Sequence, residues 1–287
     1  MKDSFISYYR LRNYLQSLIL LAGMLVLLGM IGWLLMGPAG VVWFLFIGIF
    51  ILIGATRISP RLMLILHGAR VLRPEDSPYL YQIVIKLAKQ SGIKDIPTLY
   101  YIPSRLINIF TTGLNENVSI AISYGLVRQL NVRELTGVLA HEISHIHGND
   151  LLVMLVADVI ARLTTMMAFV GFILLWVYIP LFVLTDEKVP WVLLIVLMMA
   201  PTVSTLMQLA LSRSREFSAD LEAAKLTGDP LSLASALEKI ESHRGNWMER
   251  MYVQYRRIQL PSLLRTHPLV IDRINRLKDI AIQMYSS

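Results

Sequence analysis

The sequence predicts an α+β membrane protein that is mainly helical, with four transmembrane helices and a small β-sheet. Composition is the first observation behind this fold class. Of the 287 residues, 55% are hydrophobic and only 16% are charged, and the mean hydropathy of +0.56 is far above that of soluble domains. The second observation is that four stretches without a charged residue alternate with segments that carry helix and strand patterns.

The first two predicted spans form a helical hairpin near the N-terminus. No residue between Arg12 and Arg57 carries a formal charge, and the apolar stretches 15–36 and 41–56 are separated only by the sequence GPAG. A helix needs roughly 20 apolar residues to cross a bilayer, and it satisfies its own backbone hydrogen bonds there. We therefore expect two spans joined by a very short turn.

The third and fourth spans are predicted at 163–185 and 189–212, joined through the charged sequence DEK. Threonine, serine and glutamine side chains make this second hairpin more polar than the first. The four spans divide the chain into four predicted domains: an N-terminal transmembrane hairpin at 1–58, an α/β part at 59–150, a second membrane hairpin at 151–212 and a helical C-terminal part at 213–287.

Lysine and arginine residues near the span ends set the predicted orientation, because cytoplasmic loops retain them. They precede the first span and follow the second and fourth, whereas the two short turns carry one lysine between them. Both termini and all larger polar segments are therefore expected in the cytoplasm. The net charge of +7 follows from this topology, and no basic cluster interleaved with aromatic residues indicates a nucleic-acid partner. The absence of cysteine excludes disulfides and thiolate ligands.

The polar segments contain both helices and strands. A Ser-Pro start and a glycine stop bound a predicted helix at 77–92. Asn131 and Glu134 have capping-box spacing at the head of another helix. The segment 213–287 is predicted to be helical, with a break at Gly228. Short β-branched and aromatic runs predict three strands of a small sheet, at 98–102, 106–113 and 117–123.

The sequence HEISHIH at 141–147 places three of the six histidines within seven residues. On a helix, His141 and His145 lie about 40° apart on one face, where two imidazoles can bind a single metal ion. Glu142 points beside that face and can hydrogen-bond a water on the metal without being a ligand. His147 is rotated by about 240° from His141 and is not expected to be a ligand. The alternative interpretation is an amphipathic helix whose polar face carries histidines.

Zinc hydrolases usually offer three protein ligands and leave one position for water, so the motif requires a third ligand. An extension of the motif by Gly-x-x-His fails, because the last position is Leu151. The best candidate is Glu216 in SRSREFSAD, with Asp220 one turn further on, where it can bind the free N–H of a histidine ligand. In the alternative interpretation these acids are surface charges paired with Arg213 or Arg215.

Three motifs in this order resemble a known protein family. HEISH is followed, after a hydrophobic hairpin, by SRSREFSAD and then by THPLVIDRINRL at 266–277. This order is similar to that of the HtpX-like membrane zinc metalloproteases, which are relatives of the type I CAAX prenyl proteases. The resemblance covers most of the chain, including the four-span layout. The chain departs from the family's usual Asn-Ala-Phe at Ile109.

The resemblance implies a gluzincin-type zinc site in the cytoplasmic domain, with one Zn²⁺ per chain. The strand LINIFTT would bind substrate as an added β-strand, through main-chain hydrogen bonds that ignore side-chain identity. The residue roles that the resemblance implies are zinc ligation by His141, His145 and Glu216, general-base catalysis by Glu142, support of a ligand by Asp220, and contacts with substrate or the oxyanion by Asn108, His267 and Arg273.

The function that the resemblance implies is that of a membrane-bound, zinc-dependent endopeptidase. It would cleave misfolded or damaged membrane proteins at the cytoplasmic face of the bacterial inner membrane, as quality control under stress. Its partners would be polypeptide substrates and the lipid bilayer. The alternatives are a catalytically silent membrane chaperone or scaffold and a narrower CAAX-type processing protease. An intramembrane protease is disfavoured, because charged residues surround HEISH.

Overall fold

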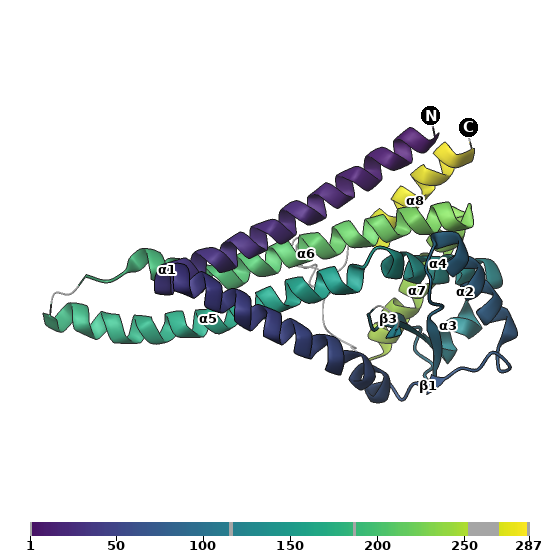
Figure 1. Cartoon of the computed structure of the whole chain (residues 1–287). Coiled ribbons are helices and arrows are strands. Elements are labelled where there is room, and N and C mark those ends of the chain that lie inside the picture. The colour runs from purple at the N-terminus through teal and green to yellow at the C-terminus, as the bar shows by residue number, and fades with distance from the viewer. Residues whose placement is uncertain (1, 115–116, 186–187, 252–269, 286–287) are drawn as a thin grey trace. The chain divides into compact units, whose positions relative to one another are not determined.

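The computed structural model describes the backbone of residues 2–114, 117–185, 188–251 and 270–285, and the side chains of these residues apart from 2–10, 57–61 and 244–251. Within these residues helices dominate, and four short strands form one sheet (Figure 1). The elements group into two compact units. The first contains the described parts of Met1–Tyr14, Thr56–Leu152 and Arg213–Ser287, and the second contains Leu15–Ala55 and Val153–Ser212.

The chain begins with α1 (Lys2–Leu66), which reverses direction near its middle (Figure 1). Met36 (φ −141°, ψ 15°) and Gly37 (φ 63°, ψ −145°) leave the helical conformation. Residues with a Cβ rarely adopt the positive φ of Gly37. The two arms meet at Gly32 and Gly40, whose backbones approach so closely that a side chain on either would collide with the other. The reversal therefore coincides with the predicted GPAG turn.

Three helical segments of the described chain are long and apolar enough to cross a membrane, and they indicate an integral membrane protein. They are Leu11–Thr56, which contains the break in α1, and the helices α5 (Asp150–Thr185) and α6 (Trp191–Thr227). Many of their outward side chains are apolar, as expected for helices that face lipid; Trp176, for example, is 79% exposed. In the second unit these helices pack through side chains that are at most 3% exposed, among them Met24, Ile31, Leu163 and Leu197.

The sheet consists of β1 (Arg70–Val71), β2 (Thr98–Ile102), β3 (Ile109–Thr112) and β4 (Ser119–Ser123). The strand order is β1-β2-β4-β3, with β2 and β4 parallel and the other pairs antiparallel. Every residue of β4 is buried, whereas β3 is an edge strand. The last three strands lie within the predicted runs. The sequence did not predict β1, because two residues carry no alternating pattern.

Three helices belong to the same unit as the sheet. In chain order they are α2 (Pro78–Ser91), α3 (Tyr124–Gln129) and α4 (Val132–His147). The predicted end of α2 is confirmed, since Gly92 has the left-handed φ of 78°. The predicted capping box of α4 is also confirmed. The Asn131 side chain accepts from Glu134 N at 2.9 Å, and the Glu134 carboxylate accepts from Asn131 N at 3.0 Å.

The C-terminal part of the chain is helical, as predicted, in the residues that the structure describes. α7 (Pro230–Met251) begins after the turn at Gly228 (φ 67°), and α8 (Val270–Tyr285) follows it. α4 packs against α2, α7 and β3, and α7 packs against α8. This arrangement encloses α4 on several sides. The core of the first unit contains fully buried side chains from all these layers, including Leu99, Ile120, Leu139, Ile143 and Leu277.

α6 runs without interruption from Trp191 to Thr227. The predicted domain boundary at 212/213 falls inside this helix, at the position where the two compact units also divide. A change from apolar to polar composition does not end a helix by itself, and α6 ends only before Gly228. Its last turns carry Glu216 and Asp220 into the first unit.

Candidate metal centre

Two histidines of α4 face the same point. The Nε2 atoms of His141 and His145 lie 3.1 Å apart, and the two rings meet edge to face. The i, i+4 spacing stacks the rings on one side of the helix, as predicted. His141 is buried and His145 is half-buried, whereas His147 is exposed. Because α4 is packed against neighbouring helices and β3, the two imidazoles have a fixed backbone.

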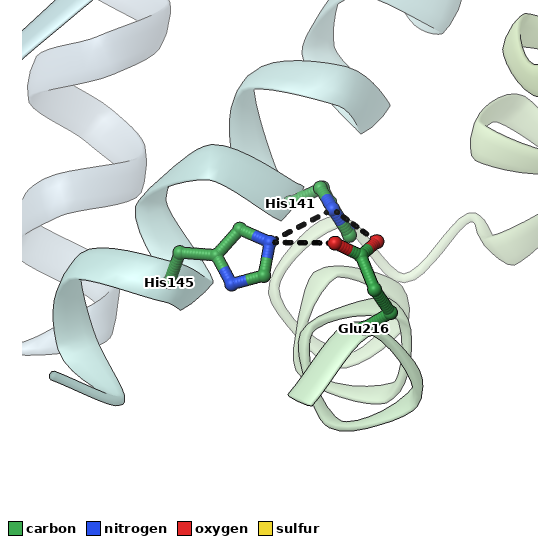
Figure 2. Close-up of side chains that lie close together, drawn as sticks. All are labelled: His141, His145 and Glu216. Carbon is green, nitrogen blue, oxygen red and sulfur yellow. Dashed lines mark hydrogen bonds and ion pairs between the residues drawn. The ribbon is translucent and has the colours of Figure 1, made fainter. Parts of the chain in front are cut away.

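Glu216 reaches this point from α6 (Figure 2). Its Oε2 lies 3.5 Å from His141 Nε2, and its Oε1 lies 3.9 Å from His145 Nε2. Ligand atoms of these three residues all lie within 4.8 Å of one another, so the group could hold a metal ion. A tetrahedral zinc ion with bonds of about 2.0–2.1 Å separates its ligand atoms by roughly 3.3 Å. The observed separations of 3.1 to 3.9 Å bracket that value.

The other ring nitrogen of each histidine contacts a carboxylate. Asp220 Oδ1 lies 3.0 Å from His141 Nδ1, and Asp150 Oδ2 lies 2.6 Å from His145 Nδ1. A carboxylate favours a proton on the nitrogen that it contacts, so in a neutral ring Nε2 carries the lone pair. Two such lone pairs 3.1 Å apart repel each other unless a proton or a metal cation lies between them. The orientation of both rings therefore suits a metal ion.

Arg273 of α8 links the carboxylates of Asp220 and Glu216. Its Nε and Nη2 donate to Asp220 at 2.8 and 2.6 Å, and its Nη1 lies 2.9 Å from Glu216 Oε2. Arg273 is 8% exposed and Asp220 is 2% exposed. A planar guanidinium that bridges two buried carboxylates holds both in one orientation. α8 thereby fixes one candidate ligand and the partner of another.

Arg215 of α6 contacts Asp150, the carboxylate next to His145. Its Nη2 forms an ion pair with Asp150 and donates to the carbonyl oxygen of Gly148 at 3.1 Å. Asp150 was not predicted as a site residue, because a turn at Asn149 (φ 52°) interrupts the helical spacing after α4. The sequence signal that could have identified it is an acidic residue immediately after the end of the histidine helix.

The centre is negatively charged in the absence of a metal. Burial disfavours the charged form of both imidazoles, but hydrogen bonds to Asp220 and Glu216 raise the pKa of His141 to about 9. Burial and the adjacent His141 lower the pKa of His145 to about 4. The pair therefore holds one proton near neutral pH. Four carboxylates (Glu142, Asp150, Glu216, Asp220), two guanidiniums (Arg215, Arg273) and this proton give a net charge of −1. Release of the proton when a divalent cation binds would leave the centre neutral.

Glu142 lies beside the candidate ligands. It is 8% exposed, and its charge is close enough to act on the pKa of His145. Thr111 of β3 donates from Oγ1 to Glu142 Oε2 at 2.6 Å. Thr111 was not predicted as a site residue, because its contact with Glu142 joins a strand and a helix that are separated in the chain.

The remaining predicted residues fall in three different situations. Asn108 is exposed just before β3, and its carbonyl oxygen accepts from Ser123 N at 3.0 Å. Arg273 binds the carboxylates already named, and its predicted contact with substrate or the oxyanion stays a prediction. His267 lies outside the described residues.

A cavity of about 170 Å³ opens beside His145. Gly113 and Leu114, which follow β3, line one part of it, and Ile146 and Asn149 line another. The cavity therefore joins the end of the edge strand to a candidate metal ligand.

Comparisons with known proteins show the family to which the chain belongs. Residues 74–281 match the family model described as Peptidase family M48. The chain is 35% identical to a protease HtpX homolog of Pyrococcus abyssi over 285 residues, which are 94% of this chain and 97% of the relative. It is 36% identical to protease HtpX of Legionella pneumophila over 284 residues, or 93% and 98% of the two chains. Its fold is like that in the crystal structure of S. mikatae Ste24p, with a TM-score of 0.53 and 19% identity over 94% of this chain and 66% of that one. The chain therefore belongs to peptidase family M48 and is a metallopeptidase similar to the HtpX proteases over nearly its full length.

Proposed function

We propose that the chain is a zinc-dependent endopeptidase in which His141, His145 and Glu216 bind one Zn²⁺ and Glu142 is the general base. One observation carries the proposal. Two imidazole Nε2 atoms and a carboxylate converge on a single point, while both Nδ1 atoms contact carboxylates. Two nitrogen ligands and one oxygen ligand suit zinc and leave a fourth position for water.

The residues of the chain divide the chemistry between them. When bound, zinc supplies Lewis acidity, which lowers the pKa of water towards neutrality. Glu142 takes the proton of the attacking water and returns it to the leaving amine. Asp220 and Asp150 would keep the two histidines in the orientation in which Nε2 can bind the ion. His267 and Arg273 are proposed to contact substrate or to stabilise the developing oxyanion.

A polypeptide substrate is proposed to bind along β3 as an added strand. The position of β3 at the sheet edge supports this mode, because an edge strand has unpaired main-chain groups. Asn108 immediately precedes this strand and would add an amide contact. The cavity beside His145 would take one substrate side chain. Main-chain recognition of this kind accepts many sequences, which fits cleavage of misfolded proteins.

The membrane arrangement is proposed to have four spans with the active site in the cytoplasm. The break at Met36 and Gly37 supports two spans within α1. Basic residues at the polar ends of the spans support the cytoplasmic orientation. Glu216 follows the apolar stretch 189–212 by four residues in the sequence, which favours cleavage close to the membrane surface and membrane proteins as substrates. The proposed role is quality control in the bacterial inner membrane, which the motif resemblance described for the sequence implies.

The test is cleavage of an unfolded protein by the detergent-purified chain with zinc supplied. Glu142→Gln should lower the rate at least about 100-fold, because it removes the general base. It should retain zinc, because Glu142 is not a proposed ligand. Glu238→Gln is the matched control, since Glu238 pairs with Lys278 on the surface. Equal cleavage by native chain and Glu142→Gln would indicate a contaminating protease. Zinc binding without cleavage by the native chain would favour the silent chaperone.

A further inference from the structure

Thr111 connects β3 to the proposed general base. Its Oγ1 donates to Glu142 Oε2 at 2.6 Å, although the two residues are 31 positions apart. Glu142 is 8% exposed, so little water competes for this oxygen. A short hydrogen bond to a charged acceptor is stronger than one between neutral groups. The bond therefore fixes the rotation of the carboxylate.

The geometry of the strand directs Thr111 at α4. Alternate side chains of a strand point to opposite faces of the sheet. Ile109 packs against the core that contains α4 residues, whereas Phe110 contacts the His67 ring and packs in a separate cluster. Thr111 shares the face of Ile109 and pairs with the fully buried Ile120 of β4. The register of the sheet thus sets the position of the hydroxyl.

We propose that Thr111 is a positioning residue for peptide hydrolysis, an inference that rests on the proposed function. A general base needs one oxygen directed at the attacking water. Because the Thr111 hydroxyl occupies Oε2, the Oε1 of Glu142 is left to accept the proton. β3 is also the strand proposed to bind the peptide. One strand then sets both the register of the substrate and the orientation of the base.

The variants Thr111→Val and Thr111→Ser distinguish the effect of the hydroxyl group from the effect of side-chain volume. Valine keeps the shape and removes the donor, whereas serine keeps the donor. Thr111→Val should lower kcat about tenfold and change KM less than about twofold, because it removes part of the general-base contribution. Thr111→Ser should keep kcat within about threefold of the native value. Thr136→Val is the control, since the Thr136 hydroxyl donates to Val132 O at 2.7 Å within α4.

A double-mutant cycle tests whether Thr111 acts through Glu142. Glu142→Asp withdraws the carboxylate from Thr111, so Thr111→Val in that background should cause no further loss of kcat. Zinc content should be equal in all variants.

The proposal is overturned by native kcat in Thr111→Val, by equal losses in the valine and serine variants, by loss of zinc, or by a rise in KM alone. It is also overturned if Thr111→Val and Glu142→Asp reduce kcat independently. The proposed function fails in a different way, namely through a native chain that binds zinc but cleaves nothing, or through full activity of Glu142→Gln.

Discussion

Asp220→Asn should weaken zinc binding while all three proposed ligands remain. The Asp220 carboxylate contacts His141 Nδ1 at 3.0 Å and accepts from Arg273 at 2.6 and 2.8 Å. Asparagine has the same shape, but an NH₂ group replaces one of the two acceptor oxygens. It therefore cannot keep all the contacts that the carboxylate makes with His141 and Arg273. Loss of a carboxylate that supports a metal ligand typically lowers metal affinity by about 10–100-fold, or about 1.4–2.7 kcal/mol.

The burial of Asp220 places the expected effect in the upper half of that range. Asp220 is 2% exposed, so water does not replace the lost oxygen. The substitution also leaves the buried Arg273 with Glu216 as its remaining carboxylate partner at the centre. The guanidinium would then draw Glu216 away from the ion, which weakens a second ligand.

Competition with a chromophoric chelator measures the zinc Kd of the purified variants. Asp158→Asn makes the same chemical change in an ion pair that includes no residue of the centre, with Arg162 at 2.7 Å on α5. Its Kd should equal the native value. A native Kd in Asp220→Asn would refute the assignment of Asp220 as the partner that orients His141. An equal loss in Asp158→Asn would attribute the effect to general destabilisation.

Two further predictions concern pH. Zinc binding at about pH 7.5 should release about one proton, because His141 (pKa about 9) is then protonated without the ion and His145 (pKa about 4) is not. Zinc affinity should therefore rise with pH up to about 9. Calorimetry in two buffers of different ionisation enthalpy measures the number of protons released. A release of no proton would contradict the prediction. Glu134→Gln should destabilise the fold by about 1–3 kcal/mol near neutral pH, because the buried Glu134 binds Lys239 and Ser235 of α7. Burial raises the pKa of Glu134, but these hydrogen bonds lower it overall, so its contribution is present above the unfolded pKa and is lost as pH falls through the folded pKa. The difference in Tm between native and variant should shrink in acid, and a constant difference would contradict the assignment.

Sequence rules predicted the structural features that depend on neighbouring residues. The capping box at Asn131 and the glycine end of α2 follow from hydrogen bonds within one or two turns. The GPAG turn follows from glycine at the positive φ of residue 37. The uninterrupted α6 was not predicted, because composition changes at Ser212 while the helix continues to Thr227.

In the site, too, contacts within one element were predictable and contacts between separate elements were not. Helical spacing alone predicted that His141 and His145 share one face, and that Asp220 follows Glu216 by one turn. No spacing rule relates Thr111 to Glu142 or Arg273 to its two carboxylates, since these contacts join separate elements. Packing determines them. The sequence therefore predicted the candidate ligands better than the groups that orient them.

The candidate ligands come from two helices that are distant in sequence, α4 and α6. An ion bound to His141, His145 and Glu216 would cross-link these helices and close a loop that spans residues 142–215. A cross-link that forms only in the folded chain stabilises it by mass action, in proportion to the logarithm of the free ion concentration over its Kd. Zinc supply would then control how long the protein survives in the membrane as well as how fast it cuts. A shortage of the ion would then destabilise the enzyme as well as inactivate it.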